Sequence, residues 1–205
     1  MRVSPISCMK NISHRFYRSS HWLIMRPLIA ESEDVKIGLI ERDDLQRIYE
    51  IFNNPKGARF LRDPTQIFYR EDVEEFYEGL RRNRDRNRIY AILYGKTADF
   101  IGTIGLYDID AKNSHAYIAF GIDQKYWGRG IATKAVSLII KYAFDTMHLR
   151  KLISSVFDPN IASRKVLEKN GFEEVGRYRR HGYVPGYGFA DEVLFERFNE
   201  KIIYI

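Results

Sequence analysis

A glycine-containing loop holds the residues of this chain whose types and spacing best fit a chemical task. It runs from Tyr126 to Ala132 with the sequence Tyr-Trp-Gly-Arg-Gly-Ile-Ala. Two glycines within three residues allow the backbone to bend so that successive N–H groups point at one spot. The apolar spacing after the loop predicts a helix over 131–147, and the positive end of its dipole would favour an anion there. We expect a diphosphate to bind at this loop.

A tight turn between a strand and a helix would explain the same glycines, because an apolar strand is expected over 115–122 directly before the loop. The usual nucleotide motifs do not match this loop. The dinucleotide fingerprint needs a third glycine, and the P-loop needs Gly-Lys before Ser or Thr, whereas Gly130 is followed by Ile131, Ala132 and Thr133. The loop by itself leaves both a phosphate site and a simple turn open.

A second motif follows the strand expected over 151–157. Residues 158–160 read Asp-Pro-Asn, which favours a turn, and Asn160 is a good N-cap for a helix over 161–170. Gly171 then provides a left-handed C-cap, and a new strand begins at the next residue. Helical spacing places one set of residues on a single face of this short helix: Asn160, Ser163, Arg164 and Leu167.

Taken together, the two motifs resemble the GNAT superfamily of acetyl-CoA-dependent N-acetyltransferases. The first reads Trp127-x-x-Gly130-x-Ala132, and the second reads Asn160-x-x-Ser163-Arg164 and ends in Asn170-Gly171-Phe172. The Tyr-Trp-Gly-basic-Gly form of the loop is similar to the ribosomal-protein-alanine N-acetyltransferase branch. The similarity covers residues 35–198, and the combination of motifs is specific in a way that neither is alone.

The resemblance implies that acetyl-CoA is the co-substrate and that its pantetheine lies between two parallel strands that splay apart. Main-chain groups of 120–122 would pair with the pantetheine amides, N–H groups of 128–132 would hold the diphosphate, and the second motif would form the other wall. Arg129 and Arg164 could bring charge to the phosphates, although a solvated cation at a helix end would equally explain Arg164. The expected cofactor-binding residues are Phe120, Gly121, Ile122, Trp127, Gly128, Arg129, Gly130, Ile131, Ala132, Asn160, Ser163 and Arg164.

Acetyl transfer to an amine needs one group to take the amine proton and one to reprotonate the thiolate. The glutamate that many members of the branch carry aligns with Tyr117, and the tyrosine of many GNAT enzymes aligns with Leu167, so both usual proton handlers are missing. The expected catalytic candidates are Ser163, Tyr117 and Asp191, with His115 as a further one. Ser163 could instead bond the helix backbone, Tyr117 could pack on the sheet, and positioning of the reactants could supply much of the rate.

Acceptor recognition is expected near a glycine-rich and aromatic segment at residues 177–191. In this interpretation Tyr183 and Tyr187 line an acceptor groove, and Asp191 or Glu192 meets the amine. An exposed β-hairpin with a flexible tip would also explain the glycines and proline of this segment. The expected acceptor is a protein N-terminal amine. A polyamine or an aminoglycoside is the enzymatic alternative, and a non-catalytic acyl-CoA-binding module is the alternative outside enzymes.

The net charge of +6 and the pI near 9.3 would suit a nucleic-acid-binding protein, but the charge is unevenly distributed. The first 30 residues hold five of the 33 Lys and Arg and none of the 27 Asp and Glu, so the rest of the chain is nearly neutral. The arginine-rich run at 81–88 fits a solvated helix end. Neither nucleic acid nor a membrane is therefore an expected partner.

Residues 1–34 are expected to form a basic, disordered extension or an over-extended start, with Met25 as an alternative first residue. Their basic, serine-containing and acid-free composition also fits a transit peptide, although no convincing amphipathic helix is present. One domain is expected over 35–205, in the cytoplasm, as a monomer or a homodimer. Cys8, the single cysteine, excludes an internal disulfide, and the five histidines show no metal spacing.

The remaining elements predict an α/β fold, in which helices cover both faces of a mixed central sheet as in GNAT proteins. Strands are expected near 35–40, 88–95, 100–108, 115–122, 151–157, 172–179 and 190–198. Helices are expected near 43–53, 71–83, 131–147 and 161–170.

Overall fold

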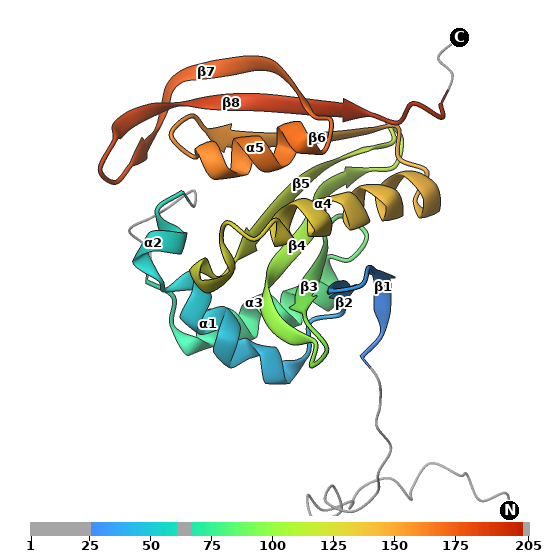
Figure 1. Ribbon diagram of the computed structural model, residues 1–205, viewed down its shortest axis with the longest axis vertical. Coiled ribbons are helices and arrows are strands. Elements are labelled where there is room, and N and C mark those ends of the chain that lie inside the picture. The colour runs from blue at the N-terminus through green and yellow to red at the C-terminus, as the bar shows by residue number, and fades with distance from the viewer. Residues whose placement is uncertain (1–25, 61–66, 203–205) are drawn as a thin grey trace, which may run out of the picture.

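An eight-stranded mixed sheet forms the centre of this protein (Figure 1). The computed structural model describes residues 26–60 and 67–202. The strands lie in the order β1-β2-β3-β4-β5-β6-β8-β7, and only β5 and β6 pair in parallel. Their bounds are β1 Leu28–Glu31, β2 Val35–Gly38, β3 Arg88–Tyr94, β4 Asp99–Asp110, β5 His115–Ile122, β6 Lys151–Phe157, β7 Glu173–Val184 and β8 Gly188–Phe198.

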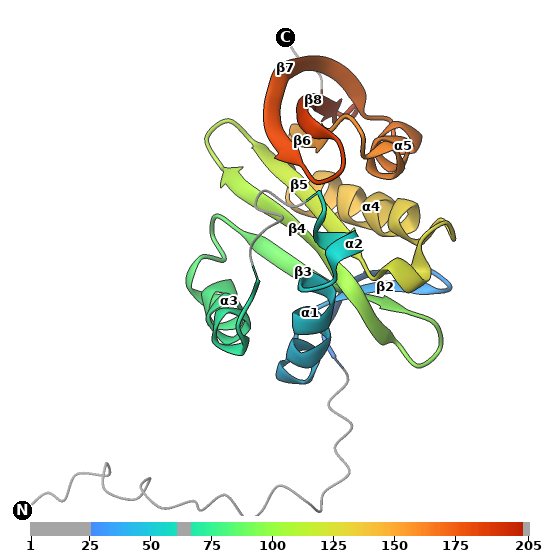
Figure 2. The same ribbon diagram turned by 90° about the vertical axis from the view of Figure 1, so that its left-hand side faces the viewer.

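Helices pack on both faces of this sheet, as the sequence predicts (Figures 1 and 2). They are α1 Leu45–Phe52, α2 Pro55–Ala58, α3 Arg70–Arg82, α4 Ile131–Lys141 and α5 Ile161–Lys169. On α4, Ala135, Val136 and Ile139 are fully buried against one face, together with Leu167 of α5. On the other face, Ile48 of α1 and Val73 of α3 cover a second core. The two faces therefore have separate cores.

The parallel strands β5 and β6 separate soon after they begin to pair. Their register runs only from His115 opposite Lys151 to Tyr117 opposite Ile153. Beyond that point β5 pairs only with β4 and β6 pairs only with β8. The last link is a side-chain bond, in which the buried Ser154 Oγ donates to the carbonyl oxygen of Ile118 at 3.1 Å. The splay leaves the edge of β5 from Ile118 to Ile122 without a strand partner on this side.

The predicted helices and strands are found with changes in their ends, and some short elements appear that were not expected. α2 was not expected, and the helix expected over 131–147 turns into a π-helical turn at Tyr142–Thr146. The hairpin strands are longer than predicted, since β7 runs to Val184 and β8 starts at Gly188. β7 is an edge strand of the sheet, and most of its side chains are exposed.

β1 lies before the expected domain boundary at residue 35 and pairs with β2 as the first strand of the sheet. Arg26 also belongs to the folded part, since its guanidinium donates to both carboxylate oxygens of the buried Asp44 at 2.8 and 2.9 Å. Cys8, Met25 and the expected extension up to residue 25 lie outside the described residues. Within the described ranges, no helix is both long and apolar enough to cross a membrane.

Candidate active site

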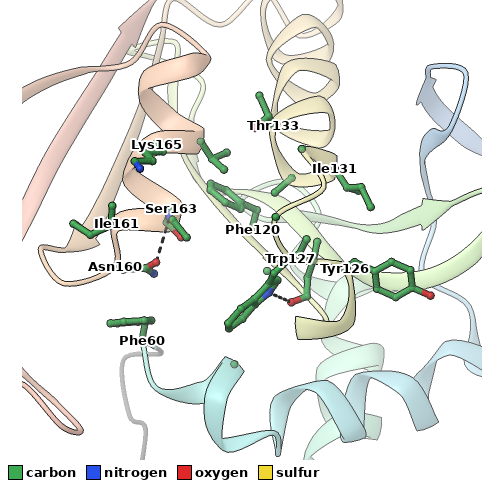
Figure 3. Close-up of a pocket in the computed structure, with 18 of the residues that line it drawn as sticks. Phe60, Phe120, Tyr126, Trp127, Ile131, Thr133, Asn160, Ile161, Ser163 and Lys165 are labelled. Atoms are coloured by element: carbon green, nitrogen blue, oxygen red, sulfur yellow. Dashed lines mark hydrogen bonds between the residues drawn. The ribbon is translucent and has the colours of Figure 1, made fainter.

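A cleft of about 600 Å³ opens where β5 and β6 separate (Figure 3). β5, the loop after it, α4 and α5 contribute most of its lining, and α1 with the segment after it closes one end. The lining residues are Ile51, Phe52, Gly57, Phe60, Phe120, Gly121, Ile122, Tyr126, Trp127, Gly128, Gly130, Ile131, Ala132, Thr133, Asn160, Ile161, Ala162, Ser163, Lys165, Val166 and Lys169. The structure thus brings together the two motifs that lie about thirty residues apart in the sequence.

The glycine loop carries a row of backbone N–H groups at the start of α4. Gly128 and Gly130 both adopt positive φ, +76° and +74°, and Gly130 is the N-cap of the helix. Within the described chain, no backbone N–H from Gly128 to Thr133 donates a hydrogen bond to a protein acceptor. A Cβ at either glycine would meet no atom within 4 Å, so the loop faces open space. Free donors at a helix N-terminus are suited to an anion.

Trp127 braces this loop from inside the cleft. Its indole Nε1 donates to the carbonyl oxygen of Ile122 at 2.9 Å, and Figure 3 shows the ring pointing toward Phe60. The neighbouring Arg129 is not a lining residue, and its guanidinium lies 5.6 Å from the ring centre of Tyr126. The loop therefore presents its backbone to the cleft, and the charge expected from Arg129 lies over an aromatic ring.

The start of α5 forms the opposite wall, as the resemblance implies. Asn160 is its N-cap, and its Oδ1 accepts the N–H of Ser163 at 3.2 Å. The Ser163 hydroxyl makes no hydrogen bond within the described chain and lines the cleft. Arg164 does not line it, because its guanidinium pairs with Asp158 at 2.7 Å and lies 3.6 Å from Glu174. The geometry thus favours a structural interpretation of Arg164.

Asn170 joins the two helices on either side of the cleft. Its buried side-chain amide donates to the carbonyl oxygens of Thr133 in α4 at 3.2 Å and of Val166 in α5 at 2.8 Å. The guanidinium of Arg197 in β8 donates to the Asn170 carbonyl oxygen. Gly171 follows with the left-handed φ of +71° that the sequence predicts for a C-cap. The end of α5 is therefore held against the first turn of α4.

Aromatic side chains surround the end of the cleft nearest α1 and α2. Phe60 lies 6.3 Å from Tyr187 between ring centres, so the segment after α2 meets the hairpin tip, and Figures 1 and 2 both show these parts close together. Phe52 packs against Phe68 at 5.4 Å. Tyr183, expected to line a groove with Tyr187, instead packs edge-on to Phe189 and is half exposed.

The side chains around residues 53 and 54 explain why an Asn-Asn-Pro sequence follows α1. Asn53 donates to the carbonyl oxygen of Phe68 at 3.1 Å and accepts its N–H at 2.9 Å. Asn54 caps α2 by accepting N–H groups of Lys56 and Gly57, and Pro55 occupies the first helical position. These bonds hold the aromatic end of the cleft in place.

The catalytic candidates lie at different places. Ser163 lines the cleft, whereas Tyr117 does not and points to the opposite sheet face from Ala116 and Ile118 in the α4 core. Asp191 accepts the N–H of Arg180 at 2.8 Å and lies 3.6 Å from Arg177, so its carboxylate holds the bulge of β7. His115 lies at the far end of β5, and its Nδ1 is buried without a partner in the described chain.

Glu192, named beside Asp191 as a group that could meet the amine, points to the other face of β8. Its carboxylate lies 3.3 Å from His181 Nε2, and it is paired in register with Phe157, near the turn that begins α5. Asp191 lies on the side of Val193, which packs in the α4 and α5 core. The two neighbouring carboxylates are therefore on different sides of the sheet.

Tyr107 lies in β4 directly opposite Tyr117. Burial raises the pKa of the Tyr107 phenol to about 12, because the charged form would lose its hydration. Gly105 makes room for this ring, since a Cβ there would lie 2.9 Å from Tyr107 Cε2. The Tyr107 phenol therefore stays protonated and neutral at neutral pH, beside the exposed Tyr117 of the neighbouring strand.

The sequence profile of the Acetyltransferase (GNAT) domain matches residues 35–173. The chain belongs to the GNAT acetyltransferase family. The splayed strands, the open N–H row and the Asn160 cap lie within the matched region. The family assignment makes this protein an N-acetyltransferase that takes its acetyl group from acetyl-CoA, and it confirms the fold expected from the two motifs.

Relatives of this acetyltransferase differ in their named acceptors. It is 33% identical over 162 residues to the "Putative ribosomal N-acetyltransferase YdaF" of Bacillus subtilis (strain 168), covering 76% of this chain and 86% of that one. It is 25% identical over 159 residues to the spermidine N(1)-acetyltransferase of Escherichia coli (strain K12), covering 77% and 83%. The crystal structure of a Vibrio cholerae spermidine N-acetyltransferase with CoA and spermine has a TM-score of 0.74 at 20% identity, covering 83% and 98%.

Several lining residues of this acetyltransferase were not among the predicted site residues. Lys165 and Lys169 could have been found, because they follow Asn160 on the same short helix and are four residues apart. Phe60 could not, because no local pattern links a residue after α2 to the cleft between β5 and α5. No group of three or more His, Cys, Asp or Glu that could hold a metal occurs among the described residues.

Proposed function

We propose that this enzyme acetylates the α-amine of a polypeptide, using acetyl-CoA as donor. The observation that carries the proposal is the absence of any Asp or Glu among the described residues that line the cleft. A polyamine carries several positive charges, and desolvating them in a cleft without carboxylates would be costly. The N-terminus of a polypeptide offers a single α-amine, which reacts in its neutral form. Apolar side chains that follow this amine would pack against the aromatic residues at the α1 and α2 end of the cleft.

Two carboxylates in an adjoining cavity are already paired. Glu50 and Asp123 line a smaller adjoining cavity of about 110 Å³ that shares Ile51 and Ile122 with the cleft. Arg47 donates to both carboxylates, at 2.6 Å to Asp123. Hydrogen bonds from Gln46 and Arg47 hold the pKa of Glu50 below its usual value. Neither carboxylate is therefore a free counter-charge for a cationic acceptor.

The lining of the cleft suits two parts of acetyl-CoA. We assign the diphosphate to the N–H groups of Gly128 to Ala132 and the pantetheine to the open edge of β5 at 120–122. Asn160 and Ser163 form the facing wall. Arg129 and Arg164, which were expected to bring charge, are left out because their guanidinium groups are engaged elsewhere.

In the reaction the amine nitrogen forms a bond to the thioester carbon and the carbon–sulfur bond breaks. The nitrogen loses a proton and the sulfur gains one, so an amide and CoA result. Ser163 is the best-placed donor to the sulfur among the three candidates, since it alone lines the cleft and its hydroxyl has no partner in the described chain. Holding the amine and the thioester close together contributes the remainder of the rate enhancement.

Single-turnover transfer from acetyl-CoA to a panel of acceptors tests the proposal. The panel contains peptides with a free α-amine, the same peptides with a blocked start and an internal lysine, spermidine and an aminoglycoside. Acetylation of the free α-amine peptides alone supports the proposal. Transfer confined to spermidine or the aminoglycoside would overturn it in favour of a small-amine enzyme, and binding of CoA without any transfer would favour an acyl-CoA-binding module.

A further inference from the structure

The charged side chains that line the cleft are two lysines, Lys165 and Lys169, among the described residues. Both are exposed, and neither forms an ion pair within the described chain. The third cation of the same helix, Arg164, is engaged with Asp158 and Glu174. α5 therefore separates its cations into a paired arginine outside the cleft lining and two lysines within that lining that form no ion pair in the described chain.

The two lysines share one edge of α5, because residues four apart in a helix lie on the same side with Cβ atoms about 6 Å apart. The bond from Asn170 to the carbonyl of Thr133 places the end of α5, and Lys169 with it, beside the first turn of α4. The open N–H row belongs to that turn and the loop before it. Lys169 therefore lies near the first turn of α4, and Lys165 lies one turn earlier in the lining of the same cleft.

We infer that Lys165 and Lys169 form a second anion site that binds the ribose 3′-phosphate of CoA. The N–H row of the loop already provides donors for the diphosphate, so a separate pair of cations on the facing wall suits the one remaining phosphate of the donor. Two ammonium groups can contact the oxygens of a single phosphate from neighbouring turns. This inference rests on acetyl-CoA as the donor and is independent of which amine is the acceptor.

Helix stability by itself explains only part of this arrangement. A lysine in the last turn of a helix interacts favourably with the helix dipole, which accounts for Lys169. Lys165 lies one turn earlier, where that effect has faded. Its place in the cleft lining, with no carboxylate partner, points to a ligand anion.

Calorimetric titration of the full chain with CoA and with dephospho-CoA tests the inference without measuring catalysis. Wild-type protein should bind CoA about tenfold or more tightly than dephospho-CoA at low salt. The double variant Lys165→Gln with Lys169→Gln should bind both ligands with nearly the same affinity, close to that of wild-type protein for dephospho-CoA. Lys141→Gln, which changes an exposed lysine in the last turn of α4, is the matched control and should keep the preference.

A wild-type protein that binds the two ligands equally, or a double variant that keeps the full preference, would overturn the inference. Equal loss of affinity for both ligands in the double variant would also overturn it, because a folding defect or a role at the diphosphate would affect dephospho-CoA as well. Failure of the wild-type chain to bind either ligand would reject the donor itself. These binding results are distinct from failure of the proposed acceptor. In that case CoA would bind normally, and no peptide of the acceptor panel would be acetylated.

Discussion

Ser154 Oγ donates a hydrogen bond to the carbonyl oxygen of Ile118 directly beyond the last paired residues of β5 and β6. A serine side chain thus replaces the next backbone bond of the ladder. It satisfies a buried carbonyl that the diverging strand can no longer reach. The cleft begins at this bond, because every strand residue beyond it on β5 has a free edge facing α5.

Ser154→Ala should lower the free energy of unfolding by about 1–2 kcal/mol, because the Ile118 carbonyl would be left buried without a donor. The affinity for CoA should fall as well, since the angle between the strands loses its side-chain link. Denaturant unfolding and calorimetric titration measure the two effects. Ser155→Ala is the control, because Ser155 is the next residue of β6 and is exposed. Equal behaviour of the two variants would contradict the role of Ser154.

Gly130→Pro should abolish CoA binding. Proline cannot adopt the φ of +74° that Gly130 has, and it removes one N–H from the cradle. Gly130→Ala should fold with a cost of about 1–2 kcal/mol from the left-handed conformation, since space for its Cβ is open. Equilibrium binding of CoA measures the effect, and Gly79→Ala in α3 serves as a control, where a Cβ also meets nothing within 4 Å. Unchanged CoA affinity in the proline variant would show that the loop is only a turn.

Ser163→Ala should lower kcat by about 100-fold while the KM for acetyl-CoA changes little, if the hydroxyl protonates the leaving sulfur. The helix should remain intact, because Asn160 bonds the N–H of Ser163 and makes no use of its hydroxyl. Steady-state kinetics with a peptide acceptor separate the two constants. Ser137→Ala, an exposed serine of α4, is the control, and Tyr117→Phe should retain activity because Tyr117 is outside the cleft lining. A kcat of the Ser163 variant equal to wild type would leave positioning as the source of catalysis.

The stability of the fold should fall in alkaline solution partly through Tyr107. Its pKa is raised to about 12 in the folded protein, so between about pH 10 and 12 the unfolded state ionises while the folded state stays neutral. The stabilisation is complete below about pH 10, and up to about 2 kcal/mol is lost as the pH rises to about 12. Tyr107→Phe should remove this part of the decline in denaturant unfolding across that range. The exposed Tyr183→Phe should not, and a Tyr107→Phe profile parallel to wild type would contradict the assignment.

Much of the cofactor half of the site could be predicted from local sequence. Gly128 and Gly130 bend the chain before a helix whose apolar spacing is clear, and Asn160 caps the next helix over a few residues. Such features depend on residues that are close together in the chain, so residue types and their spacing are enough to predict them. The same holds for the alternation of strands and helices that identified the fold. The proton handlers could not be predicted in this way, because Ser163, Tyr117 and Asp191 differ in which face of an element they occupy.

The sequence by itself determined the family, the sheet with helices on both faces, and the loop that suits a diphosphate, because each depends on periodicity and on residues close together in the chain. Only the tertiary structure decided which side chains meet. In the folded protein Arg164 forms an ion pair with Asp158, and Asp191 accepts a hydrogen bond from the bulge of β7. The ring of Phe60 lies next to that of Tyr187. The tertiary structure also placed Lys165 and Lys169 in the lining of the cleft. These contacts join segments far apart in the chain, and their geometry follows from how β5 and β6 separate and how α5 packs on α4.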